Sequence, residues 1–189
     1  MKVPAGRSRA TAPKDQMRRG TAAPGSPPAP ELEVARWFNT AAPITLASLR
    51  GKVVVVHAFQ LLCPGCVAHA IPQARRLYEL SRGTDLAVLG LHTVFEHHAA
   101  MTAVTLEAFL HEYGIAFPVG VDQPAADGPI PRTMKAYGMR GTPSTIIIDR
   151  DGLLVRHSFG AEDDLAFGML LGNLLNEHAI PETEGRARE

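Results

Sequence analysis

Two closely spaced cysteines are the residues of this chain whose type and spacing most directly suggest chemistry. They lie in the stretch FQLLCPGCVAHAIP (59–72), where Pro64 and Gly65 separate Cys63 from Cys66, and they are the 2 cysteines of the sequence. Such a pair can bind a metal, form a structural crosslink, or cycle between a dithiol and a disulfide. The sequence around the pair discriminates among these three uses.

A structural crosslink and a metal site are both poorly supported. A bridge between Cys63 and Cys66 closes a very short loop, and in the chain-entropy model such a loop adds little stability. A zinc site usually takes four ligands, and the sequence holds no second Cys-x-x-Cys. His97 and His98 leave a Cys2His2 site open, although solvated loop residues are the simpler interpretation of them. The sequence therefore favours redox chemistry and predicts no metal and no cofactor.

The pair stands where a buried strand is expected to meet a helix. KVVVVHAF (52–59) is a β-branched run typical of a central strand, and apolar residues recur at helical spacing over 65–80. A helix N-terminus offers free backbone N–H groups and the positive end of the helix dipole, and both stabilise a thiolate. Cys63, at or just before the first turn, is therefore predicted to attack. Cys66, expected to be more buried, is predicted to resolve the mixed disulfide.

The rest of the chain alternates between strand and helix patterns. Further strands are predicted at 85–94, at 117–122 and as a hairpin over 144–160. Further helices are predicted at 105–115, 131–139 and 162–178. Residues 44–51 are predicted to add an edge strand and a turn. This order predicts an α/β domain with a central mixed β-sheet flanked by helices on both faces.

Length and composition indicate one globular domain between two tails. The chain has 189 residues, 46% of them hydrophobic, and a formal net charge of +0, so nothing predicts nucleic-acid binding. Residues 1–30 and 181–189 lack periodicity and are predicted to be disordered, with the domain over 31–180. No apolar run predicts a signal peptide or a membrane span, so the expected compartment is the cytoplasm and no membrane partner is expected.

Two motifs far apart in the chain share their patterns with a known family. LRGKVVVVHAFQLLCPGC (49–66) contains Gly-Lys, an apolar strand and Cys-x-x-Cys, and YGMRGTPSTIIIDRDG (137–152) has Thr-Pro before a strand. From about Leu46 to His178 the chain resembles the thioredoxin-like superfamily, and within it the TlpA/ResA-type thiol–disulfide oxidoreductases and the neighbouring peroxiredoxin (AhpC/TSA) group. The resemblance implies a thioredoxin-like fold with a short N-terminal extension. It also implies an oxidoreductase acting on a disulfide-containing protein or a small thiol or peroxide, with a dithiol reductant as partner.

The resemblance also points to supporting residues. It implies a cis peptide between Thr142 and Pro143, in a loop that faces the cysteines, where the Thr142 backbone can pair with an extended substrate. Thioredoxin-like proteins often carry a buried Asp at the position of His57. As a neutral imidazole His57 can accept the proton of Cys66, or it is a hydrogen-bonded core histidine. Leu62 replaces the aromatic residue that commonly precedes the first cysteine, which loosens the assignment to protein-disulfide reduction.

Two alternative functions stay open. Peroxiredoxins have a Pro-x-x-x-Thr-x-x-Cys pattern, and this chain departs from it in both registers. If Cys66 attacks a peroxide, Cys63 can resolve its sulfenic acid. Arg140, just before Gly-Thr-Pro, can supply positive charge near a peroxide or a thiolate. A non-enzymatic redox sensor with the same fold has the same sequence features.

Overall fold

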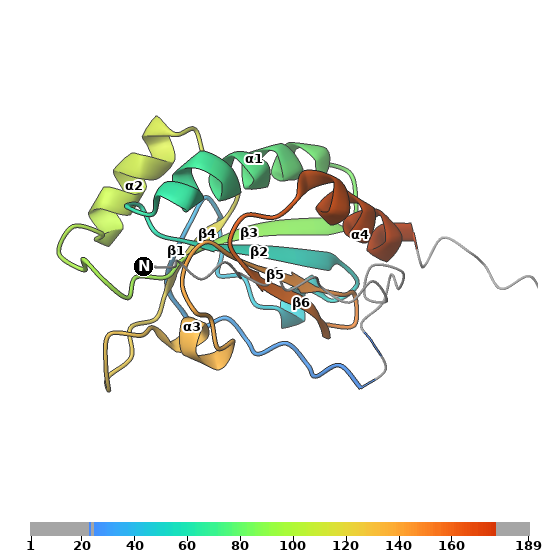
Figure 1. Ribbon diagram of the computed structural model, residues 1–189, viewed down its shortest axis with the longest axis horizontal. Coiled ribbons are helices and arrows are strands. Elements are labelled where there is room, and N and C mark those ends of the chain that lie inside the picture. The colour runs from blue at the N-terminus through green and yellow to red at the C-terminus, as the bar shows by residue number, and fades with distance from the viewer. Residues whose placement is uncertain (1–22, 24, 177–189) are drawn as a thin grey trace, which may run out of the picture.

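A six-stranded mixed sheet is the centre of the fold (Figure 1). The computed structural model describes residue 23 and residues 25–176 of the chain. The strands are β1 (Val34–Phe38), β2 (Val53–Phe59), β3 (Leu86–His92), β4 (Val119–Asp122), β5 (Ser144–Ile148) and β6 (Leu154–Phe159). Their order in the sheet is β1-β4-β3-β2-β5-β6. β2, β3 and β4 run parallel, whereas β1, β5 and β6 pair with their neighbours antiparallel, so the mixed sheet is confirmed.

Helices cover both faces of the sheet (Figure 1). They are the 3-10 turn η1 (Ala47–Leu49), the π turn η2 (Cys66–Ala70), α1 (Ile71–Leu80), α2 (Ala103–Glu112), α3 (Arg132–Ala136) and α4 (Asp164–Asn176). α1, α2 and α4 pack on one face, and α3 packs on the other with the segment before β2. None of the helices in the described part of the chain has the length and apolar character that a membrane span requires.

β2 is central because both of its faces are apolar. All seven of its residues are buried, which is typical of a strand covered by helices on both sides. Side chains alternate along a strand, so Val53 and Val55 pack with Phe167 of α4, whereas Val54 and Val56 pack with Met134 of α3. The strand is therefore packed on both faces of the sheet, and the loop after its C-terminal end carries the cysteine pair.

The edge strand is not where the sequence analysis expects it. Within residues 44–51 the chain forms the turn η1 (Ala47–Leu49), because Ser48 and Thr45 hydrogen-bond to each other's backbone and close a tight loop. Strand β1 takes the edge instead and pairs with β4 from Val34 to Phe38. The edge strand predicted within 44–51 was therefore wrong, whereas the predicted turn is present, since local hydroxyl hydrogen bonds compete there with strand pairing.

The packed part of the chain begins before residue 31. Pro28 bridges to Leu153, the N–H of Ala29 donates to the Gly152 carbonyl at 2.9 Å, and the Tyr137 hydroxyl donates to the Pro30 carbonyl at 2.6 Å. The predicted end of the N-terminal tail at residue 30 is therefore too late. Residues 1–22, residue 24 and the whole predicted tail 181–189 lie outside the described residues, as do the last residues of the helix predicted over 162–178.

Candidate active site

Cys63 and Cys66 form a disulfide where the loop after β2 enters a helix. The Cys63 carbonyl accepts the N–H of Val67 at 3.1 Å, and the Cys63 Sγ accepts the N–H of Cys66 at 3.2 Å. Cys63 thus caps the helix, and Pro64, the first helical residue, has no N–H to leave unpaired. This is the position that the sequence analysis expects, where backbone donors stabilise a negative sulfur.

The two sulfurs differ in accessibility. Cys66 is 0% exposed and belongs to the core cluster of Phe59 and Ile71, whereas Cys63 is only half-buried and packs against the edge of that cluster. In the disulfide form a molecule arriving from solvent therefore meets Cys63, and Cys66 is shielded behind it.

The helix that follows the cysteines has an internal irregularity. The stretch predicted at 65–80 is helical, but its first part is the π turn η2 and α1 begins at Ile71. Pro72 explains the break, because it has no N–H to donate and its ring crowds the carbonyl of the preceding turn. A π turn widens the helix there and is frequent at functional sites.

The loop before β5 lies against the cysteine pair. The Thr142–Pro143 peptide is cis, and the Thr142 carbonyl oxygen lies 3.5 Å from the Cys63 Sγ. A Cβ atom at Gly65 would lie 3.4 Å from the Pro143 Cδ, so the ring packs directly on the turn between the cysteines. Folding thus brings together Cys63, Cys66, Thr142 and Pro143, which lie in two distant motifs of the sequence.

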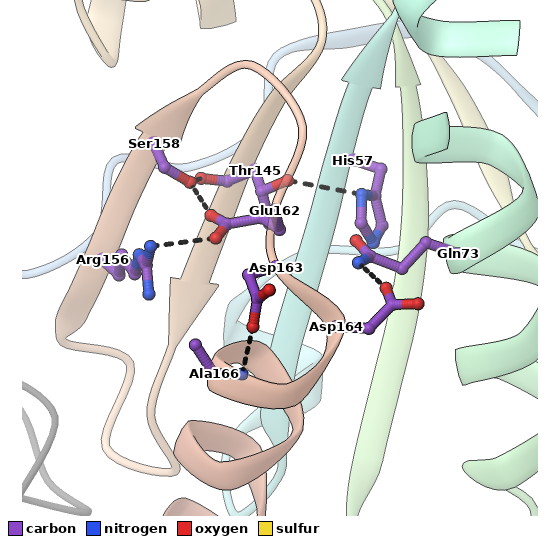
Figure 2. Close-up of polar contacts among 9 residues, drawn as sticks. All are labelled: His57, Gln73, Thr145, Arg156, Ser158, Glu162, Asp163, Asp164 and Ala166. Atoms are coloured by element: carbon purple, nitrogen blue, oxygen red, sulfur yellow. Dashed lines mark hydrogen bonds and ion pairs between the residues drawn. The ribbon is translucent and has the colours of Figure 1, made fainter. Parts of the chain in front are cut away.

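His57 is buried in β2, on the face of the sheet that Phe59 and the cluster of Cys66 share. Its Nδ1 lies 3.4 Å from the Thr145 Oγ1 (Figure 2), and its Nε2 has no hydrogen-bond partner among the described residues. Burial lowers the pKa of His57 from 6.5 to about 4, so the ring is neutral at pH 7.

Arg140 points elsewhere. It is exposed, and its guanidinium carbon lies 5.2 Å from the centroid of the Phe159 ring. No hydrogen bond or ion pair joins it to the cysteine pair within residues 25–176. His97 and His98 are exposed in a turn, and the described side chains contain no group of three or more His, Cys, Asp and Glu that is placed to hold a metal.

The sequence profile of the AhpC/TSA family matches residues 26–157, a range that contains both cysteines, Thr142 and Pro143. The chain belongs to the AhpC/TSA family. Among curated relatives, Protein DipZ of Mycobacterium tuberculosis (strain CDC 1551 / Oshkosh) is 32% identical over 152 residues, which are 79% of this chain and 21% of DipZ. Thiol-disulfide oxidoreductase ResA of Halalkalibacterium halodurans is 26% identical over 123 residues, which are 65% of this chain and 62% of ResA. The chain thus spans about a fifth of DipZ.

Two solved structures share the fold and much of the sequence of this AhpC/TSA-family chain. The thioredoxin-like superfamily protein SPOA0173 is 58% identical with a TM-score of 0.77, and the match covers 79% of this chain and 97% of that one. A thiol-disulfide isomerase from Corynebacterium glutamicum is 48% identical with a TM-score of 0.77, over 81% of this chain and 98% of that one. The predicted thioredoxin-like fold is therefore confirmed.

The sequence analysis missed three polar residues of this AhpC/TSA-family domain. His92 at the end of β3 is 1% exposed, and neither ring nitrogen has a hydrogen-bond partner among the described residues. Thr145 contacts His57, and the buried Glu162 carboxylate accepts hydrogen bonds from Arg156 and Ser158. His92 and Thr145 have a weak signal in the sequence, since each is a polar residue inside an apolar strand run, whereas Glu162 has none.

The two buried histidines predict an acid-sensitive stability for this AhpC/TSA-family domain. Burial lowers the pKa of both His57 and His92 from 6.5 to about 4. As the pH falls, the histidines of the unfolded chain are protonated before those of the folded chain. The contribution of their neutral burial to the free energy of unfolding is therefore complete above pH 6.5 and is lost as the pH falls towards 4. We expect the free energy of unfolding, measured by urea denaturation, to drop by roughly 2 kcal/mol per histidine from pH 7 to pH 5.

A His92→Leu variant separates this effect from the titration of carboxyl groups. The variant replaces the imidazole with an apolar side chain of similar size and so removes one of the two depressed pKa values. Its loss of unfolding free energy between pH 7 and pH 5 is expected to be smaller than that of the wild type by the contribution of one histidine. An identical pH dependence in the two proteins would contradict the neutral burial of His92.

Proposed function

We propose that this chain is a thiol–disulfide oxidoreductase in which Cys63 attacks and Cys66 resolves. One observation carries the proposal: a disulfide whose outer sulfur caps a helix lies against a cis-proline loop. The names of the similar proteins, thiol-disulfide oxidoreductase ResA and a thiol-disulfide isomerase, support the same chemistry. The greater exposure of Cys63 favours it as the attacking sulfur.

The geometry supports a two-step exchange. In the reduced protein, the N–H of Cys66 and the helix terminus stabilise a thiolate on Cys63. This thiolate attacks one sulfur of a substrate disulfide, the substrate S–S bond breaks, and the other substrate sulfur leaves as a thiolate. Cys66 then attacks the Sγ of Cys63, so the internal disulfide forms and the second substrate sulfur leaves. A dithiol reductant of the cell regenerates the pair.

Substrate binding is proposed to use the Thr142 backbone. The Thr142 carbonyl lies beside the Cys63 sulfur and the segment leads into β5, so an extended substrate can align there as in strand addition. The exposed side chains of Leu62 and Phe159, 58% and 49% exposed, favour a polypeptide partner with apolar side chains. The cytoplasmic location stays a prediction of the sequence analysis.

Thiol labelling and two activity assays test this function. We expect the oxidised protein to resist alkylation and the protein treated with dithiothreitol to take up label on both cysteines. The reduced protein is expected to reduce insulin disulfides and to consume no peroxide. Peroxide consumption without insulin reduction would support the peroxidase alternative, and redox cycling of the pair without either activity would support the redox sensor.

A further inference from the structure

Arg140 presents a positive charge beside the loop that faces the cysteine pair. It lies two residues before Thr142, so the Cα atoms of the two residues are at most about 7 Å apart. The side chain is exposed, and no carboxylate lies within ion-pair distance of it among the described residues. The exchange of sulfurs described above makes no use of this charge.

The Phe159 ring joins the Arg140 side chain to that loop. The guanidinium carbon lies 5.2 Å from the ring centroid, within the range of a cation–π contact. The ring also lies against the loop, since a Cβ atom at Gly141 would be 3.0 Å from the Phe159 Cε2. The N–H of Gly160 donates to the Pro143 carbonyl at 2.8 Å and ties the end of β6 to the same loop. Guanidinium, ring and loop therefore form one surface.

The titratable groups next to this surface leave its positive charge in place. Burial and, to a lesser extent, the charge of Arg140 lower the pKa of His157 from 6.5, so this imidazole is neutral at pH 7. The carboxylate of Glu162, in the loop after β6, is already paired with Arg156. A carboxylate that arrives from solvent therefore meets a guanidinium that no described residue neutralises.

A substrate segment that aligns beside Thr142 has residues on both sides of the one opposite Thr142. Whichever way the segment runs, the residues on one side lie towards Arg140, at a spacing of about 3.3 Å per residue along an extended chain. The N–H groups of a guanidinium match the two oxygens of a carboxylate. The methylene groups of an acidic side chain can at the same time contact the exposed Phe159 ring.

Resting on the thiol–disulfide function proposed above, we propose that Arg140 makes this protein prefer polypeptide disulfides that carry an aspartate or a glutamate within two residues of the attacked cysteine. The substrate carboxylate accepts hydrogen bonds from the guanidinium while Cys63 attacks the substrate sulfur. Arg140 is thus a specificity-determining residue, which binds the substrate and takes no part in the exchange of sulfurs.

Reduction of three synthetic peptides by the reduced full-length protein tests this preference. Each peptide closes one disulfide between two cysteines, and the three differ only in having glutamate, glutamine or lysine next to the first cysteine. Each rate constant is divided by that of dithiothreitol with the same peptide, because neighbouring charges also change the reactivity of the disulfide itself. We expect the glutamate peptide to react about three- to fivefold faster than the glutamine peptide, and the lysine peptide to be slowest. High salt is expected to reduce this difference.

Variants at the surface identify the residue responsible. Arg140→Gln is expected to bring the ratio of the glutamate rate to the glutamine rate close to one. Arg140→Glu is expected to reverse the order, so that the lysine peptide reacts fastest. Arg82→Gln is the matched control, because Arg82 is also exposed, has no ion pair among the described residues and follows the end of α1 that is farther from the cysteines. It is expected to keep the wild-type ratios.

Equal normalised rates for the three peptides in the wild type would overturn the preference and leave the exchange of sulfurs standing. A preference that persists in Arg140→Gln, or one that Arg82→Gln also loses, would overturn the role of Arg140. The wild-type series decides the preference even if a variant does not fold. A wild-type protein that reduces none of the three peptides would overturn the proposed function, and the preference with it.

Discussion

Cys63→Ser is expected to lower the rate of insulin-disulfide reduction by more than about a thousandfold, as the loss of an enzyme's nucleophile does. The physical reason is that a hydroxyl is not ionised at neutral pH and cannot replace the thiolate that the helix terminus stabilises. The measurement is the turbidity of reduced insulin, with dithiothreitol as electron donor and the uncatalysed rate subtracted.

Cys66→Ser is the matched variant for this experiment. It keeps the attacking sulfur but removes the buried one that resolves, so we expect a mixed disulfide between Cys63 and the substrate to accumulate. Non-reducing electrophoresis and intact mass detect that adduct. If the adduct instead forms on Cys66 in the Cys63→Ser variant, the roles of the two cysteines are reversed. Peroxide consumption by that variant would favour the peroxidase alternative in which Cys66 attacks the peroxide.

Phe117→Ala is expected to lower the free energy of unfolding by about 3–5 kcal/mol, the usual cost of removing a fully buried aromatic side chain. Phe117 is 1% exposed and belongs to the same core cluster as Cys66. Its ring centroid lies 6.1 Å from the ring centroid of Tyr78, and a Cβ atom at Gly90 would lie only 2.9 Å from the Phe117 Cε2. The surroundings are therefore tightly packed and cannot close the cavity. Urea denaturation measures the change.

Phe159→Ala provides the control for the stability experiment. Phe159 is 49% exposed at the end of β6, so the same substitution there is expected to change the free energy of unfolding by less than about 1 kcal/mol. A loss at Phe117 no larger than the loss at Phe159 would show that the cluster beneath the cysteine pair contributes little to stability.

Much of the site was predictable because it lies in short local patterns. The β-branched run before Cys63 fixes a buried strand, Pro64 suits the first turn of a helix, and the cysteine spacing allows a disulfide. The mixed sheet also follows from the order of strand and helix patterns. The edge strand β1 could not be predicted from the sequence, because Val34–Phe38 lacks regular alternation of apolar and polar residues and pairs with β4, which is distant in sequence.

The sequence by itself determined the reactive pair, the strand and helix that present it, and the Thr-Pro motif that accompanies it. Each of these depends on neighbouring residues, whose propensities act over a few positions. Only the tertiary structure decided that Arg140 turns towards Phe159 and that Thr145 contacts the buried His57 ring. Those facts depend on how separate strands and helices pack, and burial is a property of the whole fold rather than of any segment.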